Sequence, residues 1–338
     1  MTPKKKAEQK AGFIIGLDLG GTKISAGALS ADGTKMSGLR SVSTQSELGA
    51  EGVVDRIIAL IEGVIADTIK ETGVSRKDFI GIGAGAPGPL DRDKGIVVVA
   101  PNLGWRDFPL SQRITSRLGI PVILDNDANC ATLGEFWLGA ARGGRNVVGI
   151  TIGTGIGGGL IINGELYHGA SDVAGEIGHT TIDVNGRHCK CGNYGCLEAY
   201  ASGPAIATRA REALVREDTA SMLPSMVDGV LERITAETVY DAAKKGDGLA
   251  NEIVRDTARY LGAGIATLLN VINPDTVVIA GGVIRAGEAL LTPLRTEVRR
   301  RAFKPAVEAA RIVPAELPGT AGVVGAVAVF KIAKLGPL

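Results

Sequence analysis

One pattern, present in both halves of the chain, limits the possible fold more than any other feature: an apolar strand, a glycine turn and a second strand. The first copy covers residues 13–29, with Gly20 and Gly21 at its turn. The second copy lies in mid-chain, where the apolar run 146–152 is broken by the glycine-rich segment 153–159 and then resumes. Short apolar runs bounded by glycine are typical of buried strands joined by turns. The repeat therefore predicts two halves of similar construction.

Strand and helix patterns alternate around these two copies. Apolar residues recur at helical spacing from Val53 to Ile65, ahead of an apolar run suited to a buried strand. Further helices are expected at 128–138, 251–271 and 321–334, and further strands at 79–82, 120–124 and 276–280. Alternating strands and helices in two similar halves predict an α/β fold of two domains that face a nucleotide-holding cleft.

The length of 338 residues favours two domains, since single cores stop growing near ~250 to 300 residues. We expect a basic, solvated tail at 1–11 and a smaller α/β domain at 12–127. A larger α/β domain is expected at 128–320, containing the cysteine-rich loop 179–196. The apolar C-terminal segment 321–338 is expected to pack back on the smaller domain as a closing helix.

Charge and hydropathy exclude several classes of partner. Lys and Arg number 37 against 36 Asp and Glu, so no overall field attracts nucleic acid or an anionic membrane. No run approaches the ~18 apolar residues of a membrane-spanning helix, and the N-terminus lacks the apolar core of a signal peptide. The sequence therefore predicts a cytoplasmic protein with neither nucleic-acid nor membrane partners.

The two glycine turns have the composition of phosphate-binding loops. Phosphates require backbone N–H groups that side chains do not obstruct, and a carboxylate and a hydroxyl stand in or beside the first turn. Asp18 is a candidate to hold Mg²⁺ through water, with Thr22 and Lys23 near the β- and γ-phosphates of a nucleotide. Taken alone, Gly20 and Gly21 are equally compatible with a simple hairpin turn. The recurrence of the pattern favours the phosphate site.

Two other nucleotide-binding folds, the Rossmann fold and the P-loop fold, also use glycine-rich loops. The glycines at 153–158 and at 83–88 both have the spacing of a dinucleotide-binding fingerprint. That fingerprint must open a helix, but a strand pattern at 160–165 follows the first run and prolines interrupt the second. No segment has the two glycines, Lys and Ser or Thr of a Walker motif. The sequence therefore disfavours both a Rossmann oxidoreductase and a P-loop enzyme.

A cluster of soft metal ligands occupies one glycine-rich stretch. It offers one imidazole and three thiols, the ligand set of a closed structural zinc site: His179, Cys189, Cys191 and Cys196. The alternative is a set of reduced structural thiols. His188 is an alternative fourth ligand, although its place next to a cysteine makes simultaneous coordination awkward. Cys130 stands apart and fits a buried apolar position. We expect Zn²⁺ to hold the loop in shape rather than to activate water.

The acidic segment 125–129 follows a buried strand and opens a helix, a placement that exposes side chains at a cleft. Asp or Asn at such a position often caps the helix. A carboxylate there is equally suited to catalysis. Both roles can coexist on different residues.

Several motifs in a fixed order carry a resemblance to one family. They run from Phe13 to Phe330: Asp18-Leu-Gly-Gly-Thr-Lys23, Asn126-Asp-Ala-Asn129, Gly153-Thr-Gly-Ile-Gly-Gly-Gly159, Glu176-Ile-Gly-His179 and Cys189-Lys-Cys-Gly-Asn-Tyr-Gly-Cys-Leu-Glu198. Together they resemble the ROK family of repressors and sugar kinases. The resemblance implies a two-domain, actin-like ATPase fold of the ribonuclease H-like type. In that fold, ATP and a hexose would meet in a cleft between the domains.

The resemblance also implies roles for individual residues. Asp127 would be the general base that accepts the proton of the sugar's 6-hydroxyl. The positions matching the family's sugar contacts are Asn102, Asn126, Asp127, Glu176, His179 and Glu198. The positions matching its phosphate and adenosine contacts are Asp18, Gly20, Gly21, Thr22, Lys23, Gly153, Thr154, Gly155, Gly281 and Gly282. Gly281 and Gly282 are also compatible with a tight turn alone. His179 would serve both zinc and sugar.

The segment Pro101–Trp105 resembles the glucokinase branch of the family, so D-glucose is the expected acceptor. Trp105 is equally suited to a core position. N-acetylmannosamine, fructose, mannose and allose remain competing acceptors, and polyphosphate a competing donor. A sugar-responsive repressor is the alternative from another class, although only about a dozen residues precede the first strand, too few for a helix-turn-helix. The resemblance further implies a homo-oligomer, either a dimer or a tetramer.

Overall fold

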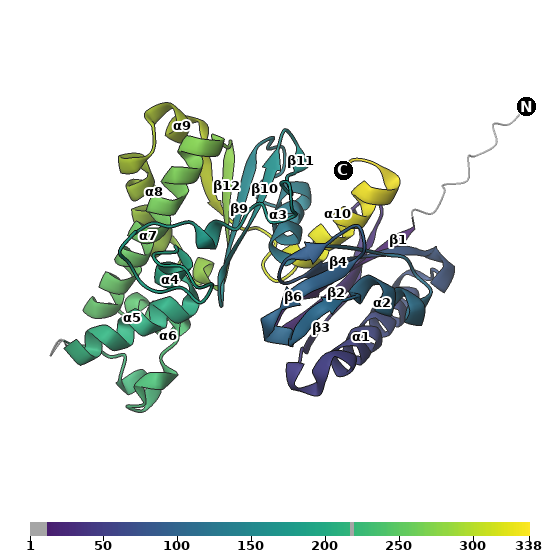
Figure 1. Ribbon diagram of the computed structural model, residues 1–338, viewed down its shortest axis with the longest axis horizontal. Helices are drawn as coiled ribbons and strands as arrows, with labels where there is room; N and C mark the ends of the chain where they lie inside the picture. Colours follow the sequence, from purple (N-terminus) through teal and green to yellow (C-terminus); the bar gives the residue numbers. More distant parts are fainter. Residues whose placement is uncertain (1–11, 217–219) are drawn as a thin grey trace, which may run out of the picture. The chain divides into compact units, whose positions relative to one another are not determined.

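The computed structural model describes residues 12–216 and 220–338 (Figure 1). It divides into two compact units, one formed by residues up to 138 together with 319–338, the other by 139–318. The basic tail expected at 1–11 lies outside the described residues. No helix within the described ranges is long and apolar enough to cross a membrane.

The first unit contains a five-stranded sheet of order β3-β2-β1-β4-β8. β1 is antiparallel to β2 and parallel to β4, and β8 continues parallel beyond β4. The strands are β1 (Phe13–Leu19), β2 (Lys23–Ser30), β3 (Met36–Ser43), β4 (Phe79–Ala86) and β8 (Val122–Asn126). The predicted strand at 79–82 is therefore longer than expected, because four further small residues continue it.

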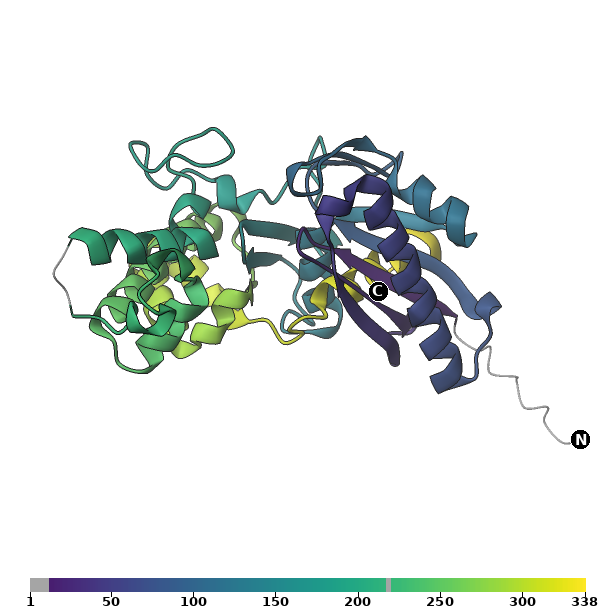
Figure 2. The same ribbon diagram turned by 90° about the horizontal axis from the view of Figure 1, so that it is seen from below.

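Alternating side chains of β1 face two different helices. Ile15 and Leu17 join a buried cluster with α1 (Gly49–Thr72). Gly16 faces α10 (Ala321–Leu335), where an added Cβ would lie 2.0 Å from the carbonyl oxygen of Val323. Figures 1 and 2 show the two helices on opposite faces of the sheet. The glycine lets the backbone of α10 approach the sheet closely, and α10 is correspondingly built from small apolar residues.

Helix α3 (Asp127–Leu138) packs against α10 within the first unit, whereas the sequence analysis placed residues 128–138 in the second domain. Glycines again permit the contact. A Cβ on Gly325 would lie 1.6 Å from the carbonyl oxygen of Cys130, and one on Gly134 would lie 2.2 Å from that of Ala321. This pairing joins segments almost 200 residues apart, so local sequence gives no sign of it.

A small antiparallel sheet and a short helix complete the first unit. Its strands are β5 (Leu90–Asp91), β6 (Ile96–Ala100) and β7 (Trp105–Phe108), and α2 (Leu110–Leu118) follows. Trp105 is buried and stacks on Phe108 with ring centroids 4.3 Å apart. Trp105 therefore belongs to the core of the first unit.

The second unit contains another five-stranded sheet, of order β11-β10-β9-β12-β13. Its strands are β9 (Val147–Ile152), β10 (Ile156–Ile162), β11 (Glu165–Leu166), β12 (Thr276–Gly281) and β13 (Arg311–Pro314). β9 and β10 are antiparallel, while β12 and β13 run parallel to β9, as β4 and β8 do to β1. The prediction of two halves of similar construction is confirmed.

Strand β10 begins at Ile156, inside the glycine-rich segment that the sequence analysis assigned entirely to a break. Gly158 explains the difference. A Cβ at this position would lie 2.7 Å from the carbonyl oxygen of Gly175, so the strand passes directly beside another backbone segment. The glycines in this part of the strand permit close packing rather than a turn.

Helices cover the second sheet through side chains. Their cluster joins β9 and β12 to the long helix α7 through Ile150, Leu261 and Ile265, among others. The helices are α4 (Glu198–Ala201), α5 (Gly203–Arg216), α6 (Ala236–Lys244), α7 (Gly248–Ile272), α8 (Glu288–Arg301) and α9 (Lys304–Ala309). The segment between β11 and α4 contains only one short 3-10 helix and forms the long loops of Figure 2.

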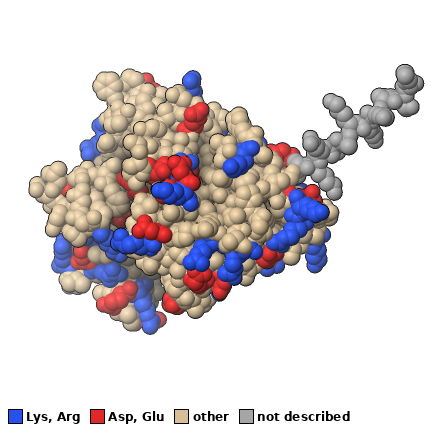
Figure 3. Space-filling view, turned by 45° about the vertical axis from the view of Figure 1, so that its right-hand side comes forward, with Lys and Arg blue, Asp and Glu red and all other residues tan. Residues whose placement is uncertain are grey.

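Acidic and basic side chains are interspersed over the face drawn in Figure 3, and no continuous basic surface is visible there. The mixture agrees with a formal net charge of +1. The absence of a nucleic-acid partner stays a prediction.

Candidate functional site

The β1–β2 turn is braced from within its own unit. Its own hydrogen bond runs from the Gly20 N–H to the carbonyl oxygen of Lys23, at 2.9 Å. The buried Thr44 makes two more: its hydroxyl donates to the Gly20 carbonyl at 2.7 Å, and its N–H donates to the Thr22 carbonyl at 2.8 Å. The turn is thus held in one shape, which a phosphate-binding loop requires.

Asn102 lies against this turn. A Cβ on Gly21 would stand 3.2 Å from the Cβ of Asn102 and 3.7 Å from its amide nitrogen. The structure therefore brings a predicted sugar contact next to a predicted phosphate contact, although 80 residues separate them in sequence. A side chain at Gly21 would separate the two groups.

Asp18 ends β1 beside the N-terminus of α10, where a Cβ on Gly322 would lie 2.6 Å from the Asp18 carboxyl carbon. Burial and the charge of Asp127 raise the pKa of Asp18 to about 6, although Lys23 lowers it. The effect of the Asp127 charge on Asp18 shows that the two carboxylates repel, and a divalent cation bound there would relieve this repulsion.

At the end of β8, two neighbouring residues differ in role: Asn126 caps the next helix, and Asp127 is partly exposed. The Asn126 side-chain oxygen accepts from the N–H groups of Ala128 and Asn129, at 2.9 and 3.2 Å, and so caps α3. Asp127 accepts from the N–H of Ala128 at 2.8 Å and is only partly buried. Asn126 is therefore the helix cap, and the catalytic role of Asp127 stays a prediction.

The buried carboxylate of Asp125 holds residues 125–129 in place. Asp125 is 1% exposed, and its carboxylate pairs with the Arg92 guanidinium at 3.2 Å and accepts from the Asn129 amide at 3.0 Å. A buried carboxylate with a cation and an amide on it holds one orientation. The Arg92–Asp125 ion pair therefore helps to position Asn126 and Asp127. No sequence motif pointed to Arg92.

In the second unit, Glu198 joins the β9–β10 turn to the cysteine loop. Its carboxylate accepts from the Ile156 N–H at 2.8 Å and lies 4.0 Å from the sulfur of Cys189. A Cβ on Gly155 would lie 2.6 Å from the Glu198 carboxylate. Gly155 is therefore needed for this close approach, which places a predicted sugar contact beside a predicted phosphate turn.

The four predicted metal ligands converge. Their donor atoms all lie within 4.8 Å of one another: His179, Cys189, Cys191 and Cys196. The sulfurs of Cys191 and Cys196 are 3.7 Å apart, and Cys189 Sγ lies 3.8 Å from His179 Nδ1. Zinc–sulfur bonds of about 2.3 Å in a tetrahedron would separate the sulfurs by about 3.8 Å, so the donor set fits zinc. His188 instead packs edge-on against Tyr194.

His179 has two differently directed ring nitrogens. Nδ1 faces Cys189 at 3.8 Å, while Nε2 lies 4.0 Å from the carboxylate of Glu176. The Glu176 side chain is half exposed. One nitrogen can therefore bind a metal while the other remains available for a ligand beside Glu176.

A second set of contacts ties the cysteine loop to the helices. Arg187 forms a two-pronged ion pair with Glu212 of α5. The Tyr200 hydroxyl accepts from the Arg187 N–H at 2.8 Å and donates to Asp183 at 3.1 Å. The loop is therefore attached at two places, the cysteine cluster and this group.

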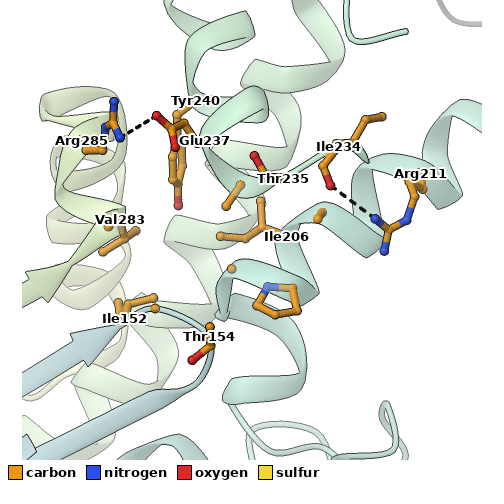
Figure 4. A pocket seen from close by; sticks show the side chains of 16 residues that line it. Ile152, Thr154, Ile206, Arg211, Ile234, Thr235, Glu237, Tyr240, Val283 and Arg285 are labelled. Atoms are coloured by element: carbon orange, nitrogen blue, oxygen red, sulfur yellow. Dashed lines mark hydrogen bonds and ion pairs between the residues drawn. The ribbon is translucent and has the colours of Figure 1, made fainter. Parts of the chain in front are cut away.

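A cavity of about 550 Å³ lies within the second unit, next to the β9–β10 turn and the end of β12 (Figure 4). It is lined largely by apolar groups, and Thr154 and Gly282 border it. Gly281, with φ of 91°, lies in the left-handed region and so requires glycine. A predicted adenosine contact and a predicted phosphate contact therefore border one cavity.

The candidate residues fall on both units. The first carries Asp18, Gly20, Gly21, Thr22, Lys23, Asn102, Asn126 and Asp127. The second carries Gly153, Thr154, Gly155, Glu176, His179, Glu198, Gly281, Gly282 and the cysteines. Sequence reasoning missed Thr44, Arg92 and the helix α6 that lines the cavity. Only α6 has a local signal, the Thr235-x-x-Thr238 capping pattern, and that pattern indicates a helix start rather than a site.

Comparison with known proteins gives a consistent result. The sequence profile of the ROK family matches residues 14–333. The glucokinase of Halalkalibacterium halodurans is 41% identical over 320 residues, covering 93% of each chain. The glucokinase of Streptomyces coelicolor is 36% identical over 320 residues, covering 93% of this chain and 96% of the relative. A crystal structure of a ROK family glucokinase from Streptomyces griseus, in complex with glucose and AMPPNP, is 38% identical with a TM-score of 0.80, covering 94% of this chain and 98% of that one.

Proposed function

This chain belongs to the ROK family and has its actin-like ATPase fold, and on that premise we propose that it is a glucokinase, which transfers the γ-phosphoryl group of ATP to the 6-hydroxyl of D-glucose. The observation that carries the proposal is the pair of neighbouring carboxylates, Asp18 and Asp127, beside a braced glycine turn. Similarity to bacterial glucokinases over almost the whole chain supports glucose as the acceptor.

Asp127 is the proposed general base. As the sugar's 6-oxygen bonds to the γ-phosphorus, its proton passes to the Asp127 carboxylate and the bond to the β–γ bridging oxygen breaks, which releases ADP. The buried Arg92–Asp125 ion pair and the Asn126 cap support this role, because they fix the backbone on either side of the base. Phosphoryl transfer needs mainly positioning and charge neutralisation, so one well-held carboxylate is sufficient.

Mg²⁺ would bind at Asp18 through water, near Thr22 and Lys23. When bound, it neutralises charge on the β- and γ-phosphates. The raised pKa of Asp18 supports this assignment, since the fold keeps a buried carboxylate whose charge Lys23 compensates only in part.

Sugar recognition is assigned to Asn102 and Asn126 of the first unit and to Glu176, His179 and Glu198 of the second. Amides, acids and an imidazole supply the donors and acceptors that a polyhydroxylated ligand requires. The contact of Asn102 with the Gly21 turn and of Glu198 with the Gly155 turn supports a sugar bound beside the phosphates.

Zn²⁺ is proposed to bind His179, Cys189, Cys191 and Cys196. It would close the loop and leave no coordination position open, so its role is to hold the side chains of Glu176, His179 and Glu198 in place. The cavity beside Gly281 and Gly282 is the proposed adenosine site, with Gly153 and Thr154 leading toward the phosphates.

A coupled ADP-release assay tests the function. The purified protein is given glucose, N-acetylmannosamine, fructose, mannose or allose, with ATP or polyphosphate as donor. We expect ATP-dependent turnover with the highest kcat/KM for glucose. Preference for another hexose would correct the acceptor alone, whereas no release with any sugar would reject the kinase, and a DNA-shift assay would then test a repressor.

Assembly and location complete the proposal. A homo-oligomer, dimer or tetramer, is proposed on the family resemblance, and light scattering coupled to size exclusion would measure it. The cytoplasm is the proposed compartment, because an ATP-dependent sugar kinase requires the ATP that is held there.

A further inference from the structure

Tyr240 carries a buried hydroxyl that has no partner in the described part of the chain. The side chain belongs to α6 and is 3% exposed. Its hydroxyl oxygen is buried and has no hydrogen-bond partner among the described residues. Burial raises the pKa of Tyr240, so the phenol keeps its proton and can donate as well as accept.

This hydroxyl points into the cavity beside the β9–β10 turn. Figure 4 shows the phenol oxygen directed between Val283 and Ile206, which line the cavity with it. A phenylalanine would fill almost the same volume without burying an unpaired polar atom. A buried polar group aimed into an open apolar space is the arrangement by which ligand sites fix the orientation of what they bind.

The two ends of the cavity differ in chemistry. Thr154, at the end away from α6 in Figure 4, belongs to the turn assigned to the phosphates. At the other end, Glu237 of α6 pairs with Arg285 at 2.6 Å, and both side chains are more than half exposed. A nucleotide with its phosphates at Thr154 would therefore place its base among apolar side chains next to Tyr240.

We propose that Tyr240 is a specificity-determining residue for the nucleotide donor, because its hydroxyl hydrogen-bonds the purine base. This inference rests on the proposed kinase function and adds to it a named contact that selects the base. Adenine presents acceptors at N1, N3 and N7 and a donor at its 6-amino group. One of these four groups is the partner of the Tyr240 hydroxyl.

The test combines one substitution with a panel of donors. Tyr240→Phe removes the hydroxyl and keeps the ring, and we expect the KM for ATP to rise about 5- to 10-fold, with kcat and the KM for glucose unchanged. Tyr167→Phe is the matched control, since Tyr167 is 51% exposed and does not line the cavity. Its KM for ATP should equal that of the unsubstituted protein.

The donor panel identifies the contact. The unsubstituted protein and Tyr240→Phe are assayed with 1-deaza-, 3-deaza- and 7-deaza-ATP and with purine riboside triphosphate. We expect one analogue to raise the KM of the unsubstituted protein and to add no further penalty in Tyr240→Phe. A purely structural role for the hydroxyl would not produce this selective loss.

Two results would overturn the proposal: an unchanged KM for ATP in Tyr240→Phe, or analogue penalties that are identical in both proteins. If Tyr240→Phe does not fold, as a melting curve would show, the unsubstituted protein decides alone, and equal KM values for ATP and all four analogues would overturn the contact. Failure of the kinase function itself is distinguishable, because the unsubstituted protein would then release no ADP with glucose and ATP.

Discussion

The two sheets have the same strand order, yet equivalent strands end in different chemistry. β8 and β13 occupy corresponding edge positions, parallel to the strand beside them. β8 ends in Asp125 and Asn126 and leads directly to Asp127, whereas β13 ends in Pro314. The scaffold is repeated but the acid–base group is not. The first unit contains the proposed base, and the second contains the cysteine loop and the apolar cavity.

The faces of the two sheets differ as well. In the first, Gly83 of β4 faces α10, and an added Cβ would stand 1.7 Å from the carbonyl oxygen of Ala326. The corresponding position in β12 is Val278, since Gly83 pairs with Gly16 and Val278 with Gly149 in matching registers. At this position the backbone of α10 approaches the first sheet, while the second sheet has a buried valine side chain. The same strand order is thus packed differently at one equivalent position.

The largest expected effect concerns Asp127, the proposed base that follows β8. Asp127→Asn should lower kcat by roughly 10²- to 10⁴-fold while glucose still binds, because the base acts on the proton in the transition state. Steady-state kinetics and calorimetric titration with glucose measure the two effects. Asp93→Asn, an exposed acid in the same unit, is the control and should turn over normally. Near-normal turnover of Asp127→Asn would remove the catalytic difference between the two strand ends.

The cysteine loop, present only in the second unit, gives the next effect. Cys196→Ala should lose metal and reduce kcat/KM for glucose about 10- to 100-fold, since Glu176, His179 and Glu198 would lose their fixed positions. Metal content is measured by atomic absorption alongside the kinetics. Cys130→Ala lies outside the cluster and should retain its metal. A metal-free Cys196→Ala protein with full kcat/KM would show that the Arg187–Glu212 attachment alone holds the loop.

The packing difference predicts that adding a methyl group at Gly83 and removing methyl groups at Val278 both lower stability. Gly83→Ala should lower the free energy of unfolding by about 1–3 kcal/mol, because α10 must move away from the added methyl. Val278→Ala should lower it by a similar ~2 kcal/mol through lost burial rather than overpacking. Gly248→Ala, where an added Cβ meets nothing within 4 Å, is the control. Urea unfolding measures all three, and an unaffected Gly83→Ala protein would contradict the backbone contact.

Local patterns predicted what depends on neighbours in sequence. The apolar run Phe13–Leu19 coincides with β1, and the helical pattern near 251–271 falls inside α7, because hydrophobic spacing decides both. The cluster of one histidine and three cysteines was also predictable, since its residue types and the glycines between them are unusual. The start of β10 was not, because glycine favours a turn unless another backbone passes close by.

Apart from the expected packing of segment 321–338 on the smaller domain, contacts between distant segments were beyond the sequence. The assignment of α3 to the first unit depends on α10, and the buried carboxylate of Asp125 depends on Arg92, which lies in the turn after β5. In sequence, Tyr240 is one position of an amphipathic helix. Only the tertiary structure shows that its hydroxyl has no partner among the described residues and faces a cavity. A single sequence carries no signal for such pairings.

The last prediction concerns the paired hairpins, in which Asp18 of β1 corresponds to Thr151 of β9 by register with β4 and β12. The pKa of Asp18 is about 6 against an ordinary value of 3.8. The folded protein therefore holds this proton more tightly than the unfolded chain. Below pH 4 both states are protonated and stability is unaffected. Stability then falls as the pH rises from about 4 to 6, and the deficit stays constant above that.

Asp18→Asn should consequently be more stable than the unsubstituted protein by ~3 kcal/mol at pH 7.5 and about equally stable at pH 3.5, while losing activity. Urea unfolding at the two pH values, without added Mg²⁺, measures the difference, with Asp93→Asn as the control. Equal gains at both pH values would mean that the amide improves packing. No gain at pH 7.5 would mean that the Asp18 carboxylate is already compensated. Only the pH-dependent gain would show that the ionised Asp18 carboxylate of the first hairpin lowers stability, at the position where the second hairpin has the Thr151 hydroxyl.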